Sequence, residues 1–218
     1  MKNSIVLATA VASILTSGIA SADLSANASI YSNYIWRGVS QTSDQAAGQG
    51  GIDWGTDGGL YAGTWLSNLS GGSYEMDVYA GFATDMFDVG VITYQYPTST
   101  DGNFTEVYAS GSIVGFTAGV ALTVDKATAA GDDTDDLYIH ASYGFAARDI
   151  DYSVYVGNYS FDADASGDSD YTHYGVSLAK DGFSFALDKN DIETGAFAFN
   201  NNDAAVRFTV GYSVDFEL

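Results

Sequence analysis

Two histidines, His140 and His173, are the residues of this chain best suited to acid–base chemistry. Ser142 follows His140 by two positions, so a β-strand would place both side chains on one face, as a serine hydrolase requires. No acidic residue that could orient the histidine, and no oxyanion-hole signature, can be identified near them. We therefore expect the histidines to form hydrogen bonds, and we expect the protein to be neither an enzyme nor a carrier of a cofactor.

The aspartate-rich run DADASGDSD, residues 162–170, resembles the first half of a calcium-binding loop, with oxygen ligands at alternate positions and a glycine at the sixth. The twelfth position holds His173 where such a loop has a bidentate glutamate, and strands are expected on both sides. A solvated acidic loop is therefore the expected state, with specific calcium binding as the alternative. The calcium ligands would be Asp162, Asp164, Asp168 and Asp170. A similar cluster comprises Asp132, Asp133, Asp135 and Asp136.

Seven charged or titratable side chains fall on the polar phase of the expected strands. An arginine on the lipid face of a membrane barrel would cost about 2 to 4 kcal/mol near the midplane, so this phase is expected to face the lumen. Two interpretations stay open: the side chains line a pore, or they pair with one another and close a narrow barrel. These pore-lining candidates are Arg37, Asp53, Asp77, Glu106, Asp151, His173 and Arg207.

Strands must position these side chains, because apolar and polar residues alternate along most of the chain. The last thirteen residues, VRFTVGYSVDFEL, place Val206, Phe208 and Val210 on one face and Arg207 and Thr209 on the other. The polar phases carry mainly Gly, Ser, Thr, Tyr and scattered Asp, whereas a water-exposed face would carry abundant Lys, Glu and Arg. The alternation therefore predicts strands with one apolar face and one face in a confined polar lumen.

Turn residues divide the chain into about twelve strands, an even number that suits a closed membrane barrel. Short turns alternate with longer polar segments, as in an outer-membrane barrel with short turns at one rim and long loops at the other. A soluble β-sandwich, the alternative fold, has no reason to sort its loops in this way. The short turns are predicted at Asp57-Gly58, Thr84-Asp85, Val114, Ala146-Ala147 and Asp181. The strands are expected near residues 24–38, 49–56, 59–67, 74–83, 86–97, 103–113, 115–125, 136–144, 149–159, 170–180, 182–189 and 204–217.

The composition limits the class of protein and its partners. Seven basic residues against 28 acidic ones give a formal net charge of −21, so nucleic acid, whose phosphates need clustered Lys and Arg, is not an expected partner. Cations and small solutes are the expected partners. The chain has no cysteine, so neither a disulfide framework nor a thiolate metal site can form.

The first 22 residues have the pattern of a secretory signal peptide. Lys2 precedes an apolar stretch that ends near Ile19, and Ala20-Ser21-Ala22 forms a small-residue cleavage site. The stretch is too short for a bilayer span. The predicted domains are therefore a signal peptide, residues 1–22, and one β-barrel domain, residues 23–218.

The segment SNYIWRGVSQ, residues 32–41, opens a pattern that continues through QGGID at 49–53 and GLYAGTWLSN at 59–68. Further pieces are EMDVYAG at 75–81, YQYP at 94–97, EVY at 106–108 and YTHY at 171–174. With these motifs the chain resembles the TorF family of porin-like proteins from proteobacteria, over nearly its whole length beyond the signal segment. The resemblance implies an outer-membrane location in a Gram-negative bacterium and a role in transport. It implies no substrate and no functional residues.

The first of these motifs combines aromatic and charged residues. Tyr34 and Trp36 share a phase, as aromatic residues of a membrane-interface belt near the end of the first strand would, and Arg37 takes the opposite phase toward the lumen. Gly38 would then open a polar loop. Alternatively, the motif fixes the pairing of the first strand with the last. At the other end of the chain, Leu218 replaces the usual terminal Phe, but Phe216 keeps an aromatic residue in phase for the barrel-assembly machinery.

Together these features predict an all-β protein, a transmembrane antiparallel up-and-down β-barrel that acts as an outer-membrane porin. Small solutes or ions would diffuse through it passively, and its acidic excess would favour cations. The alternative is a structural or surface-interaction barrel with a closed lumen, whose acidic extracellular loops bind divalent cations. In either case the barrel would contact outer-membrane lipid and lipopolysaccharide.

Overall fold

The computed structural model describes residues 23–99, 102–127, 135–162, 170–192 and 204–218. The predicted signal peptide, residues 1–22, lies outside the described residues. Strands form most of the described chain, and none of its helices is long and apolar enough to cross a membrane. The structure is therefore an all-β fold, as the alternation of residues predicts.

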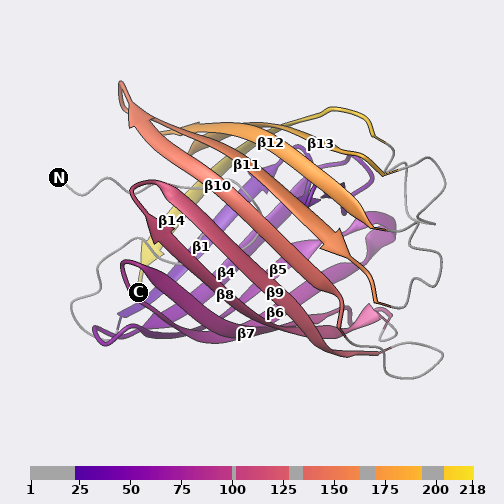
Figure 1. Ribbon diagram of the computed structural model, residues 1–218, viewed down its shortest axis with the longest axis horizontal. Helices are drawn as coiled ribbons and strands as arrows, with labels where there is room; N and C mark the ends of the chain where they lie inside the picture. The colour runs from indigo at the N-terminus through magenta and orange to yellow at the C-terminus, as the bar shows by residue number, and fades with distance from the viewer. Residues whose placement is uncertain (1–22, 100–101, 128–134, 163–169, 193–203) are drawn as a thin grey trace.

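Twelve antiparallel strands form one closed barrel, in which each strand pairs with its neighbours in the chain (Figure 1). The barrel closes where β1 pairs with both β4 and β14, with Tyr31 opposite Ala47 on one side and Gly211 on the other. The amphipathic C-terminal strand is therefore the closing strand of the barrel. The twelve strands are β1 (Asp23–Tyr31), β4 (Ala47–Gly55), β5 (Leu60–Asn68), β6 (Tyr74–Ala83), β7 (Phe87–Gln95), β8 (Phe104–Ile113), β9 (Phe116–Lys126), β10 (Leu137–Ala147), β11 (Ile150–Ser160), β12 (Tyr171–Lys180), β13 (Phe183–Asn190) and β14 (Arg207–Glu217).

The outer face of the barrel is apolar, and the inner face is polar and aromatic. Along β6, Val78 faces outward and is 48% exposed, whereas its neighbours Asp77 and Tyr79 face inward and are buried. Closure pairs the backbone along every strand, which a bilayer requires because it offers no water to unpaired groups. The barrel is thus built to span a membrane. Its outward apolar residues include Leu24, Ile52, Leu66, Val91, Val120, Ile139, Val154, Val176, Phe185 and Phe208.

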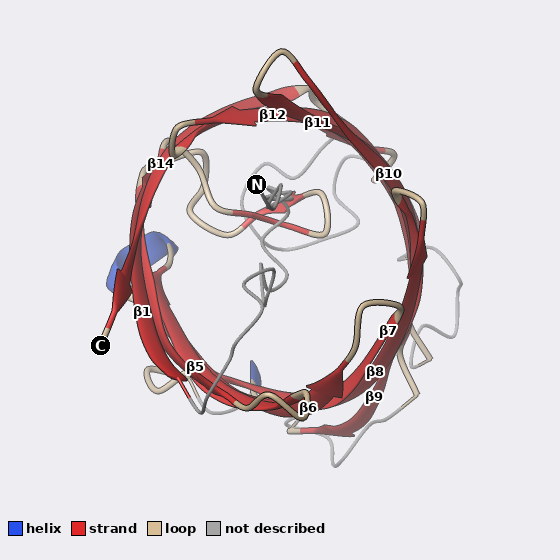
Figure 2. Ribbon diagram, turned by 90° about the vertical axis from the view of Figure 1, so that its left-hand side faces the viewer, coloured by secondary structure: helices blue, strands red, loops and turns tan. Residues whose placement is uncertain are grey.

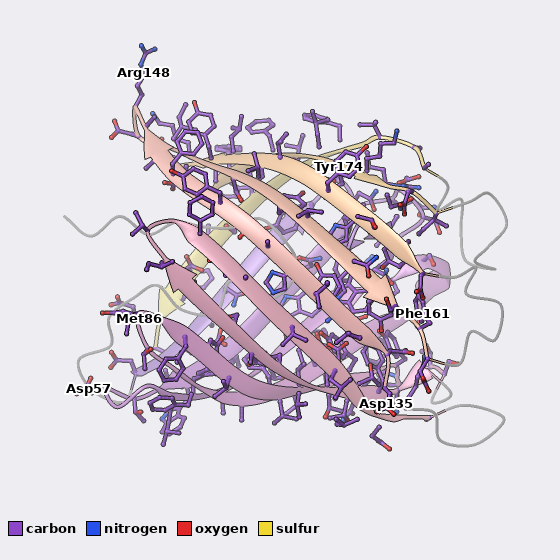
Figure 3. All side chains as sticks on the ribbon, in the orientation of Figure 1. Asp57, Met86, Asp135, Arg148, Phe161 and Tyr174 are labelled. Carbon is purple, nitrogen blue, oxygen red and sulfur yellow. The ribbon has the colours of Figure 1, made fainter. Side chains whose placement is uncertain are left out.

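The connections are sorted by length, as predicted. Figure 3 places Asp57, Met86 and Arg148 at the end of the barrel with the short turns, and Asp135 and Phe161 at the opposite end. One predicted turn was wrong: Ala146 and Ala147 belong to β10, and the turn consists of Arg148 and Asp149. Both turn residues have positive φ, 54° and 58°, as the two-residue turns that match the twist of a hairpin require.

Aromatic side chains gather on the outer face near the short turns. The rings of Phe116 and Tyr143 lie 4.4 Å apart between centroids, and those of Phe183 and Tyr212 lie 4.7 Å apart. Phe116 and Phe183 are the first residues of β9 and β13 after short turns, and Tyr143 and Tyr212 lie opposite them in the strand register. All four are at least one-third exposed. Rings at this level suit the boundary between hydrocarbon and headgroups, so they form an aromatic girdle at this rim.

Candidate functional site

The lumen contains a loop that the alternation pattern did not predict. The first strand, expected over residues 24–38, ends at Tyr31, and residues 32–46 turn back into the barrel; we call this segment the inner loop. Two short strands, β2 (Ile35–Trp36) and β3 (Val39–Ser40), pair within it. Figure 2 shows this small hairpin inside the ring of barrel strands.

The local sequence of the inner loop explains its compact shape. Arg37 and Gly38 both have positive φ, 48° and 79°, and form the tip of the hairpin. The Asn33 carboxamide oxygen accepts hydrogen bonds from the hydroxyls of Ser40, at 2.7 Å, and Thr42, at 3.0 Å. The loop therefore satisfies many of its own polar groups before it contacts the barrel wall.

Arg37 joins the tip of the inner loop to the wall of the barrel. Its Nη1 and Nη2 atoms donate to the two carboxylate oxygens of Glu106 on β8, at 2.8 and 2.6 Å. The guanidinium carbon lies 4.4 Å from the ring centre of Trp36 and 4.1 Å from that of Tyr138. Burial lowers the pKa of Arg37, but the Glu106 carboxylate outweighs this and holds the pKa above its ordinary value. The guanidinium therefore stays charged, in a bidentate and desolvated ion pair.

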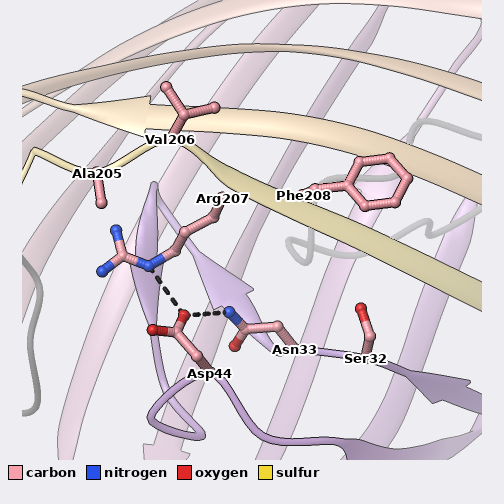
Figure 4. A pocket seen from close by; sticks show the side chains of 7 residues that line it. All are labelled: Ser32, Asn33, Asp44, Ala205, Val206, Arg207 and Phe208. Carbon is pink, nitrogen blue, oxygen red and sulfur yellow. Dashed lines mark hydrogen bonds and ion pairs between the residues drawn. The ribbon is translucent and has the colours of Figure 1, made fainter.

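Three further contacts anchor the inner loop at other points around the wall. The Tyr34 hydroxyl donates to Glu75 on β6 at 2.7 Å, and the Asn190 side-chain amide on β13 donates to the Gly38 carbonyl at 2.7 Å. Arg207 on β14 donates to Asp44 at 3.0 Å, beside the bond from Asn33 to the same carboxylate (Figure 4). Since β6 and β13 lie far apart around the barrel, the inner loop spans the lumen.

These contacts correct the prediction that Tyr34 and Trp36 belong to a membrane-interface belt. Tyr34 is 2% exposed, and Trp36 packs edge-on against Tyr94 and Phe104 with ring centroids 5.8 and 6.1 Å apart. Both residues thus lie inside the lumen and not in a membrane-interface belt. The alternative, that the motif pairs the first strand with the last, holds only for its first residue. The Ser32 backbone N–H donates to the Val210 carbonyl on β14 at 2.8 Å, and the Ser32 hydroxyl accepts from the Val210 N–H at 3.0 Å, whereas the ladder between β1 and β14 ends at Tyr31.

Tyrosines fill much of the remaining lumen and pair with its carboxylates. Tyr79 donates to Asp53, and Tyr155 donates to Asp188. The Tyr155 ring lies flat over Gly175, where a Cβ atom would come within 2.3 Å of the Tyr155 hydroxyl oxygen. Among the described residues, the inward carboxylates outnumber the inward arginines, Arg37 and Arg207. These carboxylates are Asp53, Glu75, Asp77, Asp88, Glu106 and Asp188.

The structure brings only some of the pore-lining candidates together. Arg37 and Glu106 form the ion pair, and a Cβ atom at Gly38 would lie 2.3 Å from the Cβ of His173. His173 and Tyr138 share a 2.9 Å hydrogen bond through Nε2. Asp77 on β6 forms no hydrogen bond to this group but interacts electrostatically with Glu106. The other three candidates stand apart: Arg207 holds Asp44, Asp53 pairs with Tyr79, and Asp151 lies at the start of β11 near the short turns.

The second histidine and the acidic loops have ordinary polar contacts. His140 stacks on Tyr138 with ring centroids 5.5 Å apart. Asp136 accepts a hydrogen bond from the Asp162 backbone at 3.0 Å and pairs with Lys126 at 2.6 Å, and Asp170 accepts from the Phe161 backbone at 2.8 Å. The described parts of these loops contain no group of three or more potential metal ligands. The other predicted loop ligands, Asp132, Asp133, Asp164 and Asp168, lie outside the described residues.

A cavity of about 650 Å³ opens where the base of the inner loop meets the start of β14 (Figure 4). Its polar wall consists of Ser32, Asn33 and Asp44, with Arg207 opposite. Val206 and Phe208, which face outward, form its edge. The cavity therefore lies at the loop rim, beside the ion pair between Arg207 and Asp44.

Known porins share the architecture of this barrel. The chain superposes on the solved structure of the KdgM porin with a TM-score of 0.53 at 9% identity, covering 89% of this chain and 99% of that one. A KdgM porin structure in complex with disordered oligogalacturonate gives 0.52 at 8% identity, with 90% and 99% covered. The NanC porin gives 0.48 at 13% identity, with 89% and 100% covered. The two KdgM likenesses support the fold prediction, a closed antiparallel transmembrane β-barrel.

A search of curated proteins found no match. The model of one protein family, described as "Bacterial protein of unknown function (Gcw_chp)", matches residues 16–215. This match extends over nearly the whole chain, although it does not carry the family name TorF. The chain therefore belongs to the Gcw_chp family of bacterial proteins.

Proposed function

We propose that this protein is an outer-membrane channel for the passive diffusion of small solutes and ions, with a preference for cations. In this proposal residues 1–22 direct export, and the barrel-assembly machinery inserts the barrel among outer-membrane lipid and lipopolysaccharide. The apolar outer face and the polar lumen support a membrane channel. The porin-like architecture is consistent with the same role.

The observation that carries the proposal is the inner loop across an acidic lumen. A loop folded into a barrel narrows the path and brings its charges close to any passing solute. The lumen carries more carboxylates than arginines, and the inner loop adds Arg37, which Glu106 neutralises. The remaining negative potential would attract cations and repel anions.

The same charge argues against an acidic polymer as the solute. One of the similar porins was solved in complex with oligogalacturonate, a chain of sugar acids. In the present protein, carboxylates of the described lumen, such as Asp77, Glu75 and Asp188, would repel an acidic polymer. We therefore propose small neutral or cationic solutes.

A second function has its own support in the structure. The inner loop is anchored to β6, β8, β13 and β14, and such a cross-brace could close the lumen entirely. The protein would then be a surface barrel whose acidic loops bind divalent cations or bridge to lipopolysaccharide. Carboxylates of these loops, such as Asp136 and Asp170, are already used in hydrogen bonds with the loop backbone.

Reversal potentials separate the two functions. The refolded protein, shown to be folded by its heat-modifiable gel mobility, is incorporated into a planar bilayer between unequal concentrations of potassium chloride. A cation-preferring channel gives a reversal potential of the sign set by potassium. A reversal potential with the sign of the chloride equilibrium potential would refute the cation preference. The absence of current from folded protein would favour the closed barrel.

A further inference from the structure

The ladder that closes the barrel stops short of the loop rim. Its last contact joins Ser32 to Val210, and the chain then leaves the wall and enters the inner loop. Since hydrogen-bonding directions alternate along an antiparallel strand, the N–H and C=O of Phe208 point to the same side as those of Val210, where β1 no longer runs. Neither group has a partner on that side among the described residues. We call the gap beside this short free edge of β14 the notch.

The notch opens into the cavity of about 650 Å³ between β14 and the base of the inner loop. Its inner wall is polar, because Arg207 and Asn33 both donate to the Oδ1 atom of Asp44. Its lip is apolar, because Val206 and Phe208 face outward and are 63% and 59% exposed. Figure 4 shows Arg207 pointing toward Asp44 and Val206 pointing away from it. The notch is thus an amphipathic site of a size that suits a ligand, since such pockets measure about 300 to 1,000 Å³.

The polar wall retains groups that a ligand can bind. The Asp44 side chain is 52% exposed, and its Oδ2 atom accepts no hydrogen bond among the described residues. The Ser32 hydroxyl accepts a backbone N–H, so its own O–H is left to donate. The free backbone groups of Phe208 add a further donor and a further acceptor. The notch therefore presents several hydrogen-bonding groups to one small volume.

The bilayer limits what the occupant can be. An unpaired sheet edge does not occur in the hydrocarbon region, because nothing there can bind its polar groups. The free edge of β14 therefore lies at the level of the lipid headgroups. Below it the outer face continues as apolar surface, with Ile30 on β1 61% exposed. An amphiphile fits both parts, with polar groups in the notch and an apolar tail along Phe208 and Ile30.

The charges of the notch favour an uncharged headgroup. Arg207 and Asp44 form an ion pair and neutralise each other. The chain as a whole has a formal net charge of −21, which repels phosphate groups. The hydroxyls of a sugar each donate and accept hydrogen bonds, as the mixed donors and acceptors of the notch require.

We infer that the notch binds the sugar headgroup of a glycolipid of the surrounding leaflet, with the acyl chain along Phe208 and Ile30. The inference rests on the membrane location in the proposed function and not on conduction through the lumen. It assigns a role to the place where β1 leaves the wall: a bound headgroup completes the hydrogen bonding that the inner loop takes away from β14.

The test is native mass spectrometry of the refolded protein in a polyoxyethylene detergent. Three probes are added separately at equal concentration: diglucosyl diacylglycerol, phosphatidic acid with the same acyl chains, and free maltose. We expect the wild-type protein to retain a single molecule of the diglucosyl lipid. Phosphatidic acid and maltose should give no retained species, because one brings a charged headgroup and the other lacks the acyl chains.

A pair of tryptophan variants locates the bound lipid. Ser32→Trp should abolish its retention, because the ring occupies the notch and the hydroxyl is lost. Ser160→Trp is a matched control at the loop end of β11, where Ser160 lies opposite the outward-facing Leu137. This variant should retain the lipid as the wild-type protein does. Heat-modifiable gel mobility shows that both variants are folded.

Several outcomes would overturn the inference. The absence of bound diglucosyl lipid from the wild-type protein would do so without any variant. Retention of maltose would make the notch a site for a free solute, and preferential retention of phosphatidic acid would make it a phosphate site. If the two tryptophan variants behave alike, the lipid binds elsewhere.

Conductance measured on the same preparations separates this inference from the proposed function. If the protein retains the diglucosyl lipid through the notch but carries no current, the channel proposal fails and the lipid site stands. If the protein is a cation-selective channel that retains no lipid, the lipid site fails and the channel proposal stands.

Discussion

The smallest unit that organises the lumen is the ion pair between Arg37 and Glu106. Both side chains are at least nine-tenths buried, with exposed fractions of 5% and 1%. Removing one partner of such a pair costs about 3 to 5 kcal/mol, because the other charge stays buried, whereas replacing both by apolar residues is often neutral. The pair therefore holds the tip of the inner loop against the barrel wall.

Replacing Arg37 alone should detach the tip of the inner loop from the barrel wall. We expect Arg37→Met to raise the single-channel conductance and to increase cation preference, because the loop loosens and Glu106 becomes unpaired. The double variant Arg37→Met/Glu106→Leu should bring the conductance back toward the wild-type value. Equal conductance in the wild-type and Arg37→Met proteins would mean that the other anchors suffice.

The sequence predicts which residues of a strand face the lumen, but it does not predict which of them contact one another. Alternation alone indicated that Asp77, Glu106 and Arg207 face the lumen, and all three are buried there. Arg37 and Glu106 are 69 positions apart in the chain, and their contact depends on the path of the inner loop. For this reason the sequence treats Asp77 and Glu106 alike, although their surroundings differ.

Among the elements, the inner loop is the one that alternation mispredicts. Its aromatic residues Tyr34 and Trp36 continue the period of β1, and a period of two cannot distinguish a ring that faces lipid from a ring that fills a lumen. The signal that could have revealed the loop is Arg37 followed directly by Gly38. Arginine suits a buried ion pair, and glycine suits a tight turn with positive φ.

Gly38 fixes the position of the inner loop. Its φ of 79° disfavours any Cβ, and a Cβ there would also meet the side chain of His173 at 2.3 Å. Gly71 is a matched control, because its φ is 71° but no atom lies within 4 Å of a Cβ there. Both substitutions by alanine carry a backbone cost of about 1 to 2 kcal/mol, and only one adds a clash.

We expect Gly38→Ala to expel the inner loop from the lumen and to expose the peptide bond after Arg37 to trypsin. Limited proteolysis of the folded barrel, followed by mass spectrometry, measures this exposure. Gly71→Ala should leave that bond protected. Equal protection in both variants would show that the loop tolerates the clash and stays in place.

At the scale of the whole molecule, the bilayer dictates the fold. Most predicted strands agree with the observed ones within two residues, because the two faces of each strand meet different surroundings. The largest error is the first strand, which stops seven residues early for the inner loop. Two further ends are wrong by three residues: β10 continues to Ala147 and not to residue 144, and β14 begins at Arg207 and not at residue 204.

A charge introduced on the outer face should destabilise the barrel by an amount that depends on the depth of that charge in the bilayer. Val78 lies in the middle of β6, whereas Val206 precedes β14 at the loop rim, and both are exposed. Val78→Arg should cost about 2 to 4 kcal/mol of folding free energy, and Val206→Arg about 0 to 1 kcal/mol. Denaturant titration in lipid vesicles measures both. Equal costs would contradict the membrane-spanning orientation.

The central claim is that the inner loop narrows a conducting lumen. Its most direct test is the single-channel conductance of the wild-type protein beside a variant in which two glycines replace residues 34–43. We predict small, stable steps for the wild-type protein and steps several times larger for the shortened one. Wild-type and shortened proteins with the same conductance, both folded by heat-modifiable mobility, would contradict the claim.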